Sequence, residues 1–336
     1  RAVELLEAVA PMFLHDNALN TKAFPSLARI QSEVVGITAD LLHGPEASGF
    51  MTSGGTESIL LAVLCARERA RAERGVRDPV LLAPHSAHPA FAKAAHYLGL
   101  RLVQIPLGAD FRADLGAAET LLREHADAVA LVVGSAPNYP FGVVDPIPEL
   151  AALAAERGIS FHTDACLGGF LLPFLEELGD PVPPFDFRVP GVATMSADVH
   201  KYGYCIKGAS VLLQRRREDL NRYQLFLYDA WPGGSYGSFG MSGARSSAPI
   251  RAASAAGVIV SATQVTAPGA RSTLDMLSPG LRRAPKVTRP SVACTARART
   301  SMRRASAGLT ARLRRSWSSA TGSASSAITR APRAAA

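Results

Sequence analysis

The chain has no run of 18 or more apolar residues, so it contains no segment of the kind that spans a membrane. Its amino end does not have the pattern of a secretory signal peptide. It has only four cysteines, Cys65, Cys166, Cys205 and Cys294, and no CxxC pair. We therefore expect reduced thiols rather than a disulfide framework or a zinc site, and we expect a cytoplasmic protein.

Acidic residues are nearly missing from the last quarter of the chain. From Arg251 onward there are 15 basic residues and one acidic residue, Asp275, whereas the first 250 residues carry 27 acidic and 21 basic residues. The net charge of +8 therefore hides two compositions. The first is typical of an acidic enzyme. The second is rich in Arg, Ala and Ser without a regular apolar period, which indicates a disordered basic tail or the wrong-frame translation of a GC-rich gene.

These observations divide the chain into an N-terminal segment (1–50), a large domain (51–250) and a basic low-complexity tail (251–336). A basic tail on an enzyme core is also compatible with binding to nucleic acid or to an anionic surface. The tail has almost no aromatic residues and no recognisable binding module. We therefore expect no nucleic-acid partner.

Amphipathic helices alternate with short apolar strands through the large domain. The pattern predicts helices over 56–74, 87–99, 113–124 and 147–158, after an earlier helix over 26–44, and strands over 79–84, 100–106, 128–134, 159–165, 192–198 and 210–214. This alternation predicts an α/β fold with a mainly parallel sheet covered on both faces. Ligands of such sheets bind at the carboxyl ends of the strands, and polar clusters in this sequence do follow strands.

The stretch MTSGGTES, Met51 to Ser58, can bind an anion. Two glycines allow a tight turn, and the following helix directs its free N–H groups and positive dipole end at the turn. Phosphate would fit there, although a plain Ser/Gly turn with a good helix cap has the same sequence. The stretch is neither a Walker loop nor a GxGxxG motif.

Two further polar residues lie at the ends of predicted strands. Asp164, in FHTDACLGG, is a carboxylate among small and apolar neighbours, so it needs a partner, either a turn that it caps or a cationic ring nitrogen. Lys201, in SADVHKYGYCIKG, would be a simple ion-pair residue if solvated. If desolvated, its amine would become a nucleophile for carbonyl groups.

A phosphate cradle, a carboxylate for a pyridine nitrogen and a lysine for an aldehyde are together the requirements of pyridoxal 5′-phosphate. His88, in SAHPAF at the start of a predicted helix, adds a flat ring that can stack on the pyridine. We therefore predict an enzyme that binds this cofactor and no metal.

Several stretches resemble the sphingosine-1-phosphate lyases, within the group II pyridoxal-phosphate-dependent decarboxylase family. They are MTSGGTESILLAVLCARERA, APHSAHPAFAKAAHYLGLRLVQIPL, GSAPNYPFGVVDPI, HTDACLGGFLLPF, PFDFRVPGVATMSADVHKYGYCIKG and WPGGSYGS. The resemblance covers about residues 18–250. It implies a type I aminotransferase-like fold with a small C-terminal domain, which is lost or garbled here, and a homodimer with active sites at the subunit interface.

The resemblance also implies roles for individual residues. Lys201 would bond covalently to the cofactor aldehyde, Asp164 would hold the pyridinium proton, and His88 would stack on the ring. The cofactor phosphate would be bound by Gly55, Thr56 and His200. Residues near the substrate would be Tyr139, Lys207 and, at the substrate phosphate, Arg245.

The implied activity is retro-aldol cleavage of sphingosine or sphinganine 1-phosphate to a long-chain aldehyde and phosphoethanolamine, a step of sphingolipid metabolism. An amino-acid decarboxylase acting on glutamate or an aromatic amino acid, or a truncated inactive homologue, stays open, because the cofactor motifs are common to both reactions. The chain departs from the family in two places. Asn20 stands where the family has a histidine, and an asparagine cannot shuttle protons near neutral pH; the tail after Ile250 resembles no part of the family.

Overall fold

The computed structural model describes residues 2–19 and 23–264. Its helices are α1 (Ala2–Met12), α2 (Pro25–Leu41), α3 (Gly55–Arg74), α4 (Ala90–Leu98), α5 (Leu115–Glu124), α6 (Ile147–Ala155), α7 (Leu172–Glu177), α8 (Arg217–Asp219), the short π-helix η1 (Leu220–Gln224) and α9 (Ala248–Gln264). Its strands are β1 (Ser48–Thr52), β2 (Val80–Pro84), β3 (Arg101–Ile105), β4 (Val129–Ser135), β5 (Ser160–Asp164), β6 (Val192–Ala197), β7 (Ser210–Gln214), β8 (Phe226–Tyr228) and β9 (Tyr236–Ser238).

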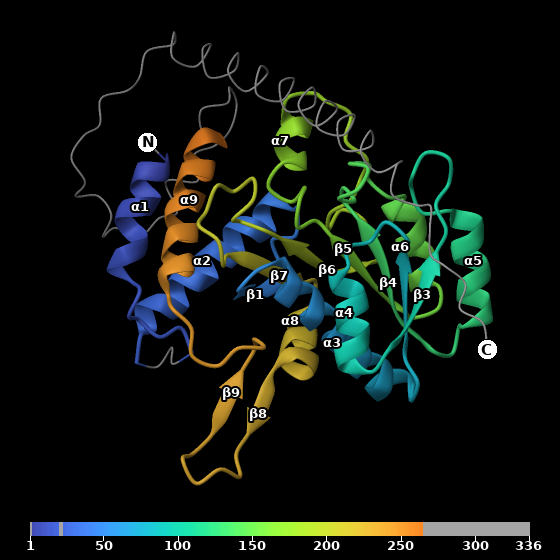
Figure 1. Ribbon diagram of the computed structural model, residues 1–336, viewed down its shortest axis with the longest axis horizontal. Helices are drawn as coiled ribbons and strands as arrows, with labels where there is room; N and C mark the ends of the chain where they lie inside the picture. The colour runs from blue at the N-terminus through green and yellow to red at the C-terminus, as the bar shows by residue number, and fades with distance from the viewer. Residues whose placement is uncertain (1, 20–22, 265–336) are drawn as a thin grey trace, which may run out of the picture. The chain divides into compact units, whose positions relative to one another are not determined.

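Seven strands form one central sheet in the order β1-β7-β6-β5-β4-β2-β3 (Figure 1). Strands β6, β5, β4, β2 and β3 are parallel, and β7 is antiparallel to both of its neighbours, β6 and β1. The expected mainly parallel α/β sheet is therefore confirmed. Two reversals give β1 the same direction as β6, so β1 also ends at the carboxyl edge of the sheet.

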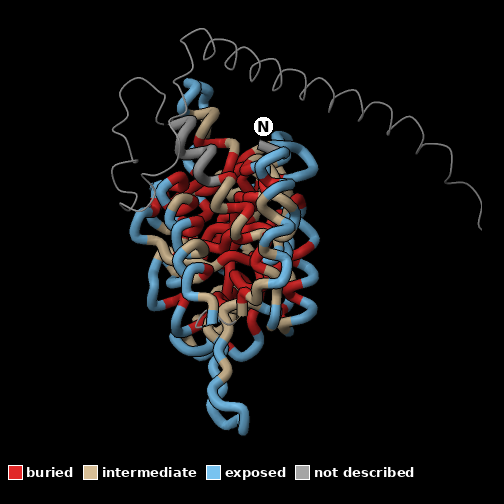
Figure 2. The backbone as a smooth tube through the Cα atoms, turned by 90° about the vertical axis from the view of Figure 1, so that its left-hand side faces the viewer, coloured by how far each residue is buried: buried red, intermediate tan, exposed pale blue. Residues whose placement is uncertain are grey.

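Helices cover both faces of the sheet, because alternate residues of the apolar strands point to opposite sides. On one face, α3 and α4 pack against side chains such as Leu131 and Val133 of β4. On the other face, α6 packs against β4 and β5, α5 against β3, and α2 against β1 and β7. Helix α9 packs on α1 and α2. The residues between the sheet and the helices on each face are buried, and they form the centre of the molecule in Figure 2.

The helices end where the sequence indicates. Helix α3 stops at Gly75, which adopts a left-handed conformation with φ 67° and caps the carbonyls of Ala70 and Arg71. Helix α5 begins after Asp114, whose side chain accepts a hydrogen bond from the Ala117 N–H. These caps fix the lengths of the helices and hence the positions of the strand ends that follow them.

Several elements were not expected from the sequence, among them the short helices α1, α7, α8 and η1. Strand β1 lies within the stretch that we interpreted as an N-terminal segment and a loop. The β8–β9 hairpin follows η1 and projects from the body of the molecule (Figures 1 and 2). Helix α9 runs across the boundary placed at Ile250, so residues 251–264 of the expected tail are helical.

Some expectations fall outside the described residues. Asn20 and residues 265–336 lie there, so the interpretations of the family histidine and of most of the tail stay predictions. Cys65, Cys166 and Cys205 are buried free thiols, as expected, and Cys294 lies outside. Within residues 2–19 and 23–264, no helix is both long and apolar enough to cross a membrane. The cytoplasmic location stays a prediction.

Candidate active site

Four chain segments leave the sheet at its carboxyl edge and bring polar groups together there. They follow β1, β4, β5 and β6, and three of them contact one another through side chains described below. The sheet order explains this meeting, because β1, β6 and β5 lie close together and run in one direction while only β7 intervenes. This edge is where ligands bind in such sheets.

The segment after β1 turns sharply into α3. Gly54 precedes the helix with φ 151°, a conformation that residues with a side chain rarely adopt. A Cβ on Gly55, the first residue of α3, would lie 2.8 Å from Cys166 Sγ and 2.9 Å from both carboxylate oxygens of Asp198. Both glycines are therefore required, and the free N–H groups of the first helical turn stay open to an anion.

Glu57 and buried hydroxyls hold this turn in place. The Glu57 carboxylate accepts hydrogen bonds from the backbone N–H groups of Ser53 at 2.6 Å and Met241 at 2.8 Å. The hydroxyl of Ser58 contacts those of Thr52 at 2.7 Å and Ser210 at 2.9 Å. The turn is thus fixed to β7 and to the segment after β9 without using the first N–H groups of α3.

Asp164 is the last residue of β5 and is only 7% exposed. Its Oδ1 accepts hydrogen bonds from the Cys166 N–H at 3.1 Å and from the Ser196 hydroxyl at 3.2 Å. No described residue donates a hydrogen bond to Oδ2. One oxygen is therefore fixed by the protein, and the other is left for a donor that enters the site.

A buried histidine, His162, forms a hydrogen bond with Ser196. His162 Nε2 lies 3.2 Å from Ser196 Oγ, and its Nδ1 lies 2.7 Å from Thr194 Oγ1. Because the Ser196 hydroxyl donates to Asp164, its oxygen is free to accept from Nε2–H, and Nδ1 then accepts from Thr194. Complete burial lowers the pKa of His162 to about 4, so the ring is neutral near pH 7. The result is a chain of hydrogen bonds that all point toward Asp164.

Lys201 lies in a compact turn after β6. The Lys201 N–H donates to the Asp198 carbonyl at 3.1 Å, and the Cys205 N–H donates to the Val199 carbonyl at 3.1 Å. Gly203 is required within the turn because a Cβ there would lie 2.6 Å from the Val199 oxygen. The Lys201 Nζ lies 2.9 Å from Asp198 Oδ2.

The charge of Asp198 governs the protonation of Lys201. Burial is the largest single influence and lowers the pKa of Lys201. The charge and hydrogen bond of Asp198, together with the nearby Cys166 and Asp164, outweigh burial, so the net pKa lies above the ordinary value for lysine. Burial also raises the pKa of the Cys166 thiol well above its ordinary value, and the charges of Asp164 and Asp198 add to this. Cys166 is therefore a neutral thiol, whereas Lys201 is an ammonium ion that is one-third exposed.

His200 lies between the Asp198 carboxylate and strand β7. Its Nδ1 accepts from the Ala209 N–H at 3.3 Å, and its Nε2 lies 3.5 Å from Asp198 Oδ2. Burial lowers the pKa of His200, and the charge of Asp198 only partly offsets this. The Nζ of the exposed Lys207 lies 3.5 Å from the carbonyl of His200.

Three other predicted residues stand apart from this network. His88 and Tyr139 are exposed on the segments after β2 and β4, and the His88 Nδ1 accepts from the Ala90 N–H at 3.1 Å. Arg245 donates to the Met51 carbonyl at 2.6 Å and to Gln31 Oε1 at 3.0 Å. Its guanidinium also lies 4.6 Å from the ring of Phe50, so its hydrogen bonds are directed into the protein.

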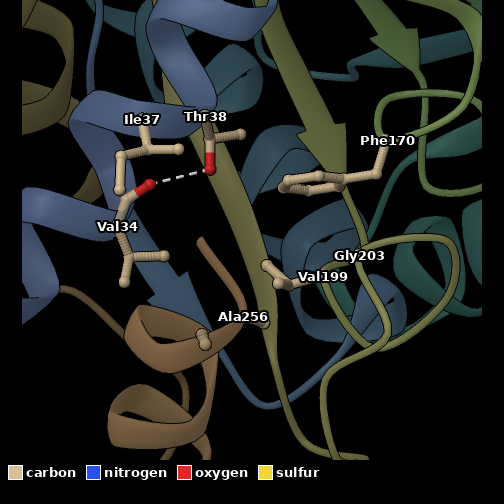
Figure 3. Close-up of a pocket in the computed structure, with 8 residues that line it drawn as sticks. Val34, Ile37, Thr38, Phe170, Val199, Gly203 and Ala256 are labelled. Carbon is tan, nitrogen blue, oxygen red and sulfur yellow. Dashed lines mark hydrogen bonds between the residues drawn. The ribbon is translucent and has the colours of Figure 1, made fainter. Parts of the chain in front are cut away.

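A small apolar pocket lies beside the turn that carries Lys201, residues 198–205, which we call the lysine turn (Figure 3). It is lined by Val34, Ile37, Thr38, Phe170, Val199, Gly203, Ala253 and Ala256. Its one hydroxyl, on Thr38, donates to the Val34 carbonyl of the same helix. The pocket has no free polar group for catalysis, and it shows that the lysine turn rests on α2 and α9.

Sequence reasoning missed Asp198, Ser196 and His162. A signal for them exists, because Thr194 and Ser196 alternate along β6, Asp198 continues the pattern just beyond it, and His162 and Asp164 alternate along β5. Polar residues at every second position of otherwise apolar strands line one face of a sheet.

The chain is similar to a known protein family and to individual proteins of that family. The family model described as the pyridoxal-dependent decarboxylase conserved domain matches residues 9–229. The sphingosine-1-phosphate lyase of Arabidopsis thaliana is 43% identical over 258 residues, which are 75% of this chain and 47% of that protein. Sphingosine-1-phosphate lyase 1 of Rattus norvegicus is 44% identical, over 76% of this chain and 44% of that protein. The chain thus spans about half the length of these relatives.

Solved structures agree in fold. A sphingosine-1-phosphate lyase of Burkholderia pseudomallei superposes with a TM-score of 0.73 at 44% identity, covering 77% of this chain and 60% of that one. A glutamate decarboxylase of Lactobacillus brevis superposes with a TM-score of 0.63 at 24% identity, a likeness of fold alone. The family match covers the segments after β1, β4, β5 and β6 that form the edge described above. The chain therefore belongs to the pyridoxal-dependent decarboxylase family.

Proposed function

We propose that this chain is the cofactor-binding part of a pyridoxal 5′-phosphate-dependent carbon–carbon lyase that cleaves long-chain phosphosphingoid bases. The observation that supports it best is the single contact network joining the α3 amino terminus, Asp198, Lys201, Cys166 and Asp164. The choice of substrate class is supported by the relatives and the solved structure at 43–44% identity, which are named sphingosine-1-phosphate lyases.

The residues present fit this cofactor. The free N–H groups of Gly55 and Thr56 would bind its phosphate, because Gly55 keeps the helix end open and backbone donors there favour an anion. Asp164 Oδ2 would accept a hydrogen bond from the protonated ring nitrogen, since Oδ1 is already occupied. Lys201 would bond to the aldehyde carbon, and the exposed ring of His88 would stack on the pyridine.

When bound, this cofactor supplies a protonated ring that accepts the electrons released as a substrate bond breaks. The protein's contribution is to keep that ring charged through Asp164, whose Oδ1 is held by Ser196 and Cys166. Lys201, once free of the cofactor, is the amine at the site that can return a proton to the substrate carbon. Lys207 would contribute a positive charge for the substrate phosphate.

For the overall reaction, the bond between the amine-bearing carbon and the hydroxyl-bearing carbon of the substrate breaks. The hydroxyl loses its proton and becomes the aldehyde, and the amine-bearing carbon gains a proton to give phosphoethanolamine. Arg245 is a weaker candidate for the substrate phosphate, because its guanidinium is directed at Met51 and Gln31.

We propose that the active form is a homodimer, and the β8–β9 hairpin supports a second copy of this chain as the partner. Phe226, Leu227, Tyr228 and Trp231 are each about half exposed on this hairpin. A two-stranded hairpin is marginal by itself, and an exposed cluster of large apolar side chains marks an interaction surface.

The cofactor is tested by adding it to the purified chain and recording the yellow absorbance of the bond to Lys201. We expect this absorbance in the wild type and in Lys93→Ala, a control on the exposed face of α4, and its loss in Lys201→Ala. Absorbance that persists in Lys201→Ala would overturn the assignment.

The reaction is tested by product. A phosphosphingoid base should give a long-chain aldehyde and phosphoethanolamine. Carbon dioxide from glutamate or an aromatic amino acid would instead establish a decarboxylase, and cofactor binding without either product would establish an inactive homologue.

A further inference from the structure

Asp198 is a buried carboxylate beside the helix end to which the proposed function assigns a phosphate. It is 3% exposed, and both of its oxygens lie 2.9 Å from the position of a Cβ on Gly55, the first residue of α3. Its Oδ1 is fully buried and has no hydrogen-bond partner among the described residues. A buried acceptor without a partner is costly, so its retention here needs an explanation.

The surroundings of Asp198 supply only part of that explanation. The amino end of α3 has a positive dipole end that favours a negative charge. Oδ2 is paired with the Lys201 ammonium at 2.9 Å, and His200 Nε2 lies 3.5 Å away. The carboxylate therefore stands where an anion is favoured, and within the part of the chain that the structure describes, Lys201 is the one ammonium or guanidinium group that it contacts.

The pairing works against the chemistry of Lys201. An ammonium ion has no lone pair for a carbonyl carbon, so Lys201 must release a proton before it can react. The charged or titratable groups that face it are Asp198 and His200 from its own turn and, from β5 and the turn after β5, Asp164 and Cys166. Asp198 makes the direct contact, and Cys166 is neutral as described above.

We propose that Asp198 is a positioning residue that holds Lys201 as an ammonium ion in the cofactor-free protein and serves as the internal anion at the α3 amino terminus until a phosphate binds there. This inference rests on the proposed function for the phosphate, whereas the ion pair itself does not. It explains why a carboxylate is buried in a site for an anionic group, and why Gly55 must lack a side chain.

The test measures amine reactivity in the cofactor-free protein. The chain is treated with acetic anhydride at a series of pH values, and the acetylation rates of Lys201 and Lys207 are followed by peptide mass spectrometry. In Asp198→Asn we expect Lys201 to react about tenfold faster below its midpoint, because loss of an adjacent opposite charge lowers a lysine pKa by about one unit or more. Lys207, in the same turn region but bonded to a carbonyl, is the internal control and should not change.

An unchanged Lys201 acetylation rate in Asp198→Asn would overturn the proposal. An equal rise in the rates of Lys201 and Lys207 would also overturn it, because that result would show that the substitution makes the whole region more accessible to the reagent. The wild type gives an independent reading if the variant does not fold. Its Lys201 should react with a midpoint at higher pH than the lysine side chain of an unstructured model peptide, and a midpoint at or below that of the peptide would also overturn the proposal.

A second readout separates this inference from the proposed function. The rate at which the cofactor absorbance develops should have its optimum at lower pH in Asp198→Asn than in the wild type. If Lys201 acetylation shifts as expected but no absorbance develops in either protein, the ion pair stands and the cofactor assignment fails. If absorbance develops with the same pH profile in both, the role of Asp198 in holding Lys201 is overturned while the cofactor assignment stands.

Discussion

Asp164 on β5 is paired in register with Ser196 on β6, and the Ser196 hydroxyl donates to Asp164 Oδ1 at 3.2 Å. On its other side, Asp164 is paired with Ser135 on β4, whose buried hydroxyl has no hydrogen-bond partner among the described residues. Two serines thus flank one carboxylate at the same level of the sheet, and only one of them orients it. This difference provides a matched pair of variants.

We expect Ser196→Ala to weaken cofactor binding roughly 10- to 100-fold, since a hydrogen bond to a charged group contributes about 1.5–3 kcal/mol. Ser135→Ala should bind the cofactor as the wild type does. Titration followed by the yellow absorbance measures both. Equal affinities for the two variants would show that Ser196 does not orient Asp164.

His162 should make the stability of the protein depend on pH. Its pKa falls from an ordinary value of about 6.5 to about 4 in the folded state, so the unfolded state binds more protons between these values. The corresponding stability is present above pH 6.5 and is lost as the pH falls toward 4, by roughly 3 kcal/mol in total. Urea unfolding should show a shallower pH dependence in His162→Asn than in the wild type.

The exposed His96 on α4 provides the control for this prediction. His96→Asn should keep the wild-type pH dependence of unfolding. If His162→Asn and the wild type lose the same stability between pH 6.5 and pH 4, the buried ring does not titrate as described.

Two glycine substitutions should have opposite effects on stability. Gly55→Ala places a Cβ within 3 Å of Cys166 Sγ and the Asp198 carboxylate, and such overpacking typically costs about 1–3 kcal/mol. Gly36→Ala on α2 meets no atom within 4 Å and should stabilise the helix by about 0.5–1 kcal/mol. Urea midpoints measure both, and a Gly55→Ala chain as stable as the wild type would contradict the tight contact.

If the proposed homodimer forms through the β8–β9 hairpin, replacing Phe226 and Trp231 by Ser should shift it toward the monomer, because it removes large apolar groups from the hairpin. Sedimentation over a range of concentrations measures the shift. Tyr97→Ser, which alters an exposed aromatic residue on α4, should leave the association unchanged. Equal dissociation of both variants, or of neither, would exclude the hairpin as the dimer contact.

The sequence predicted the inner strands and the long helices well, because their apolar residues recur with clear periods. Strand β1 was missed because SGFMT is short, mixed in character and followed by Ser53 and two glycines. Its place in the sheet depends on pairing with β7, which lies far along the chain. The hairpin was missed because its strands are three residues long and bury no core side chain.

For the site, single residues such as Lys201 and Asp164 stood out because their chemistry contrasts with their neighbours. Asp198, by contrast, was hidden beside Lys201, since its importance depends on Gly55, a residue on a different segment. Contacts between distant segments of this kind cannot be read from spacing, because they follow from the order of strands in the sheet.

The hydrogen bond between Ser58 and Ser210 joins residues 152 positions apart. Closing such a distant contact costs more chain entropy than closing a local one, and proteins rich in distant contacts fold slowly. During synthesis, a growing chain that has not yet passed Ser210 holds the glycine turn and Asp164 but lacks the strand that secures the turn to the rest of the edge. The ability to retain the cofactor would therefore arise only after Ser210 has been synthesised. A chain that terminates before Ser210 would not retain the cofactor.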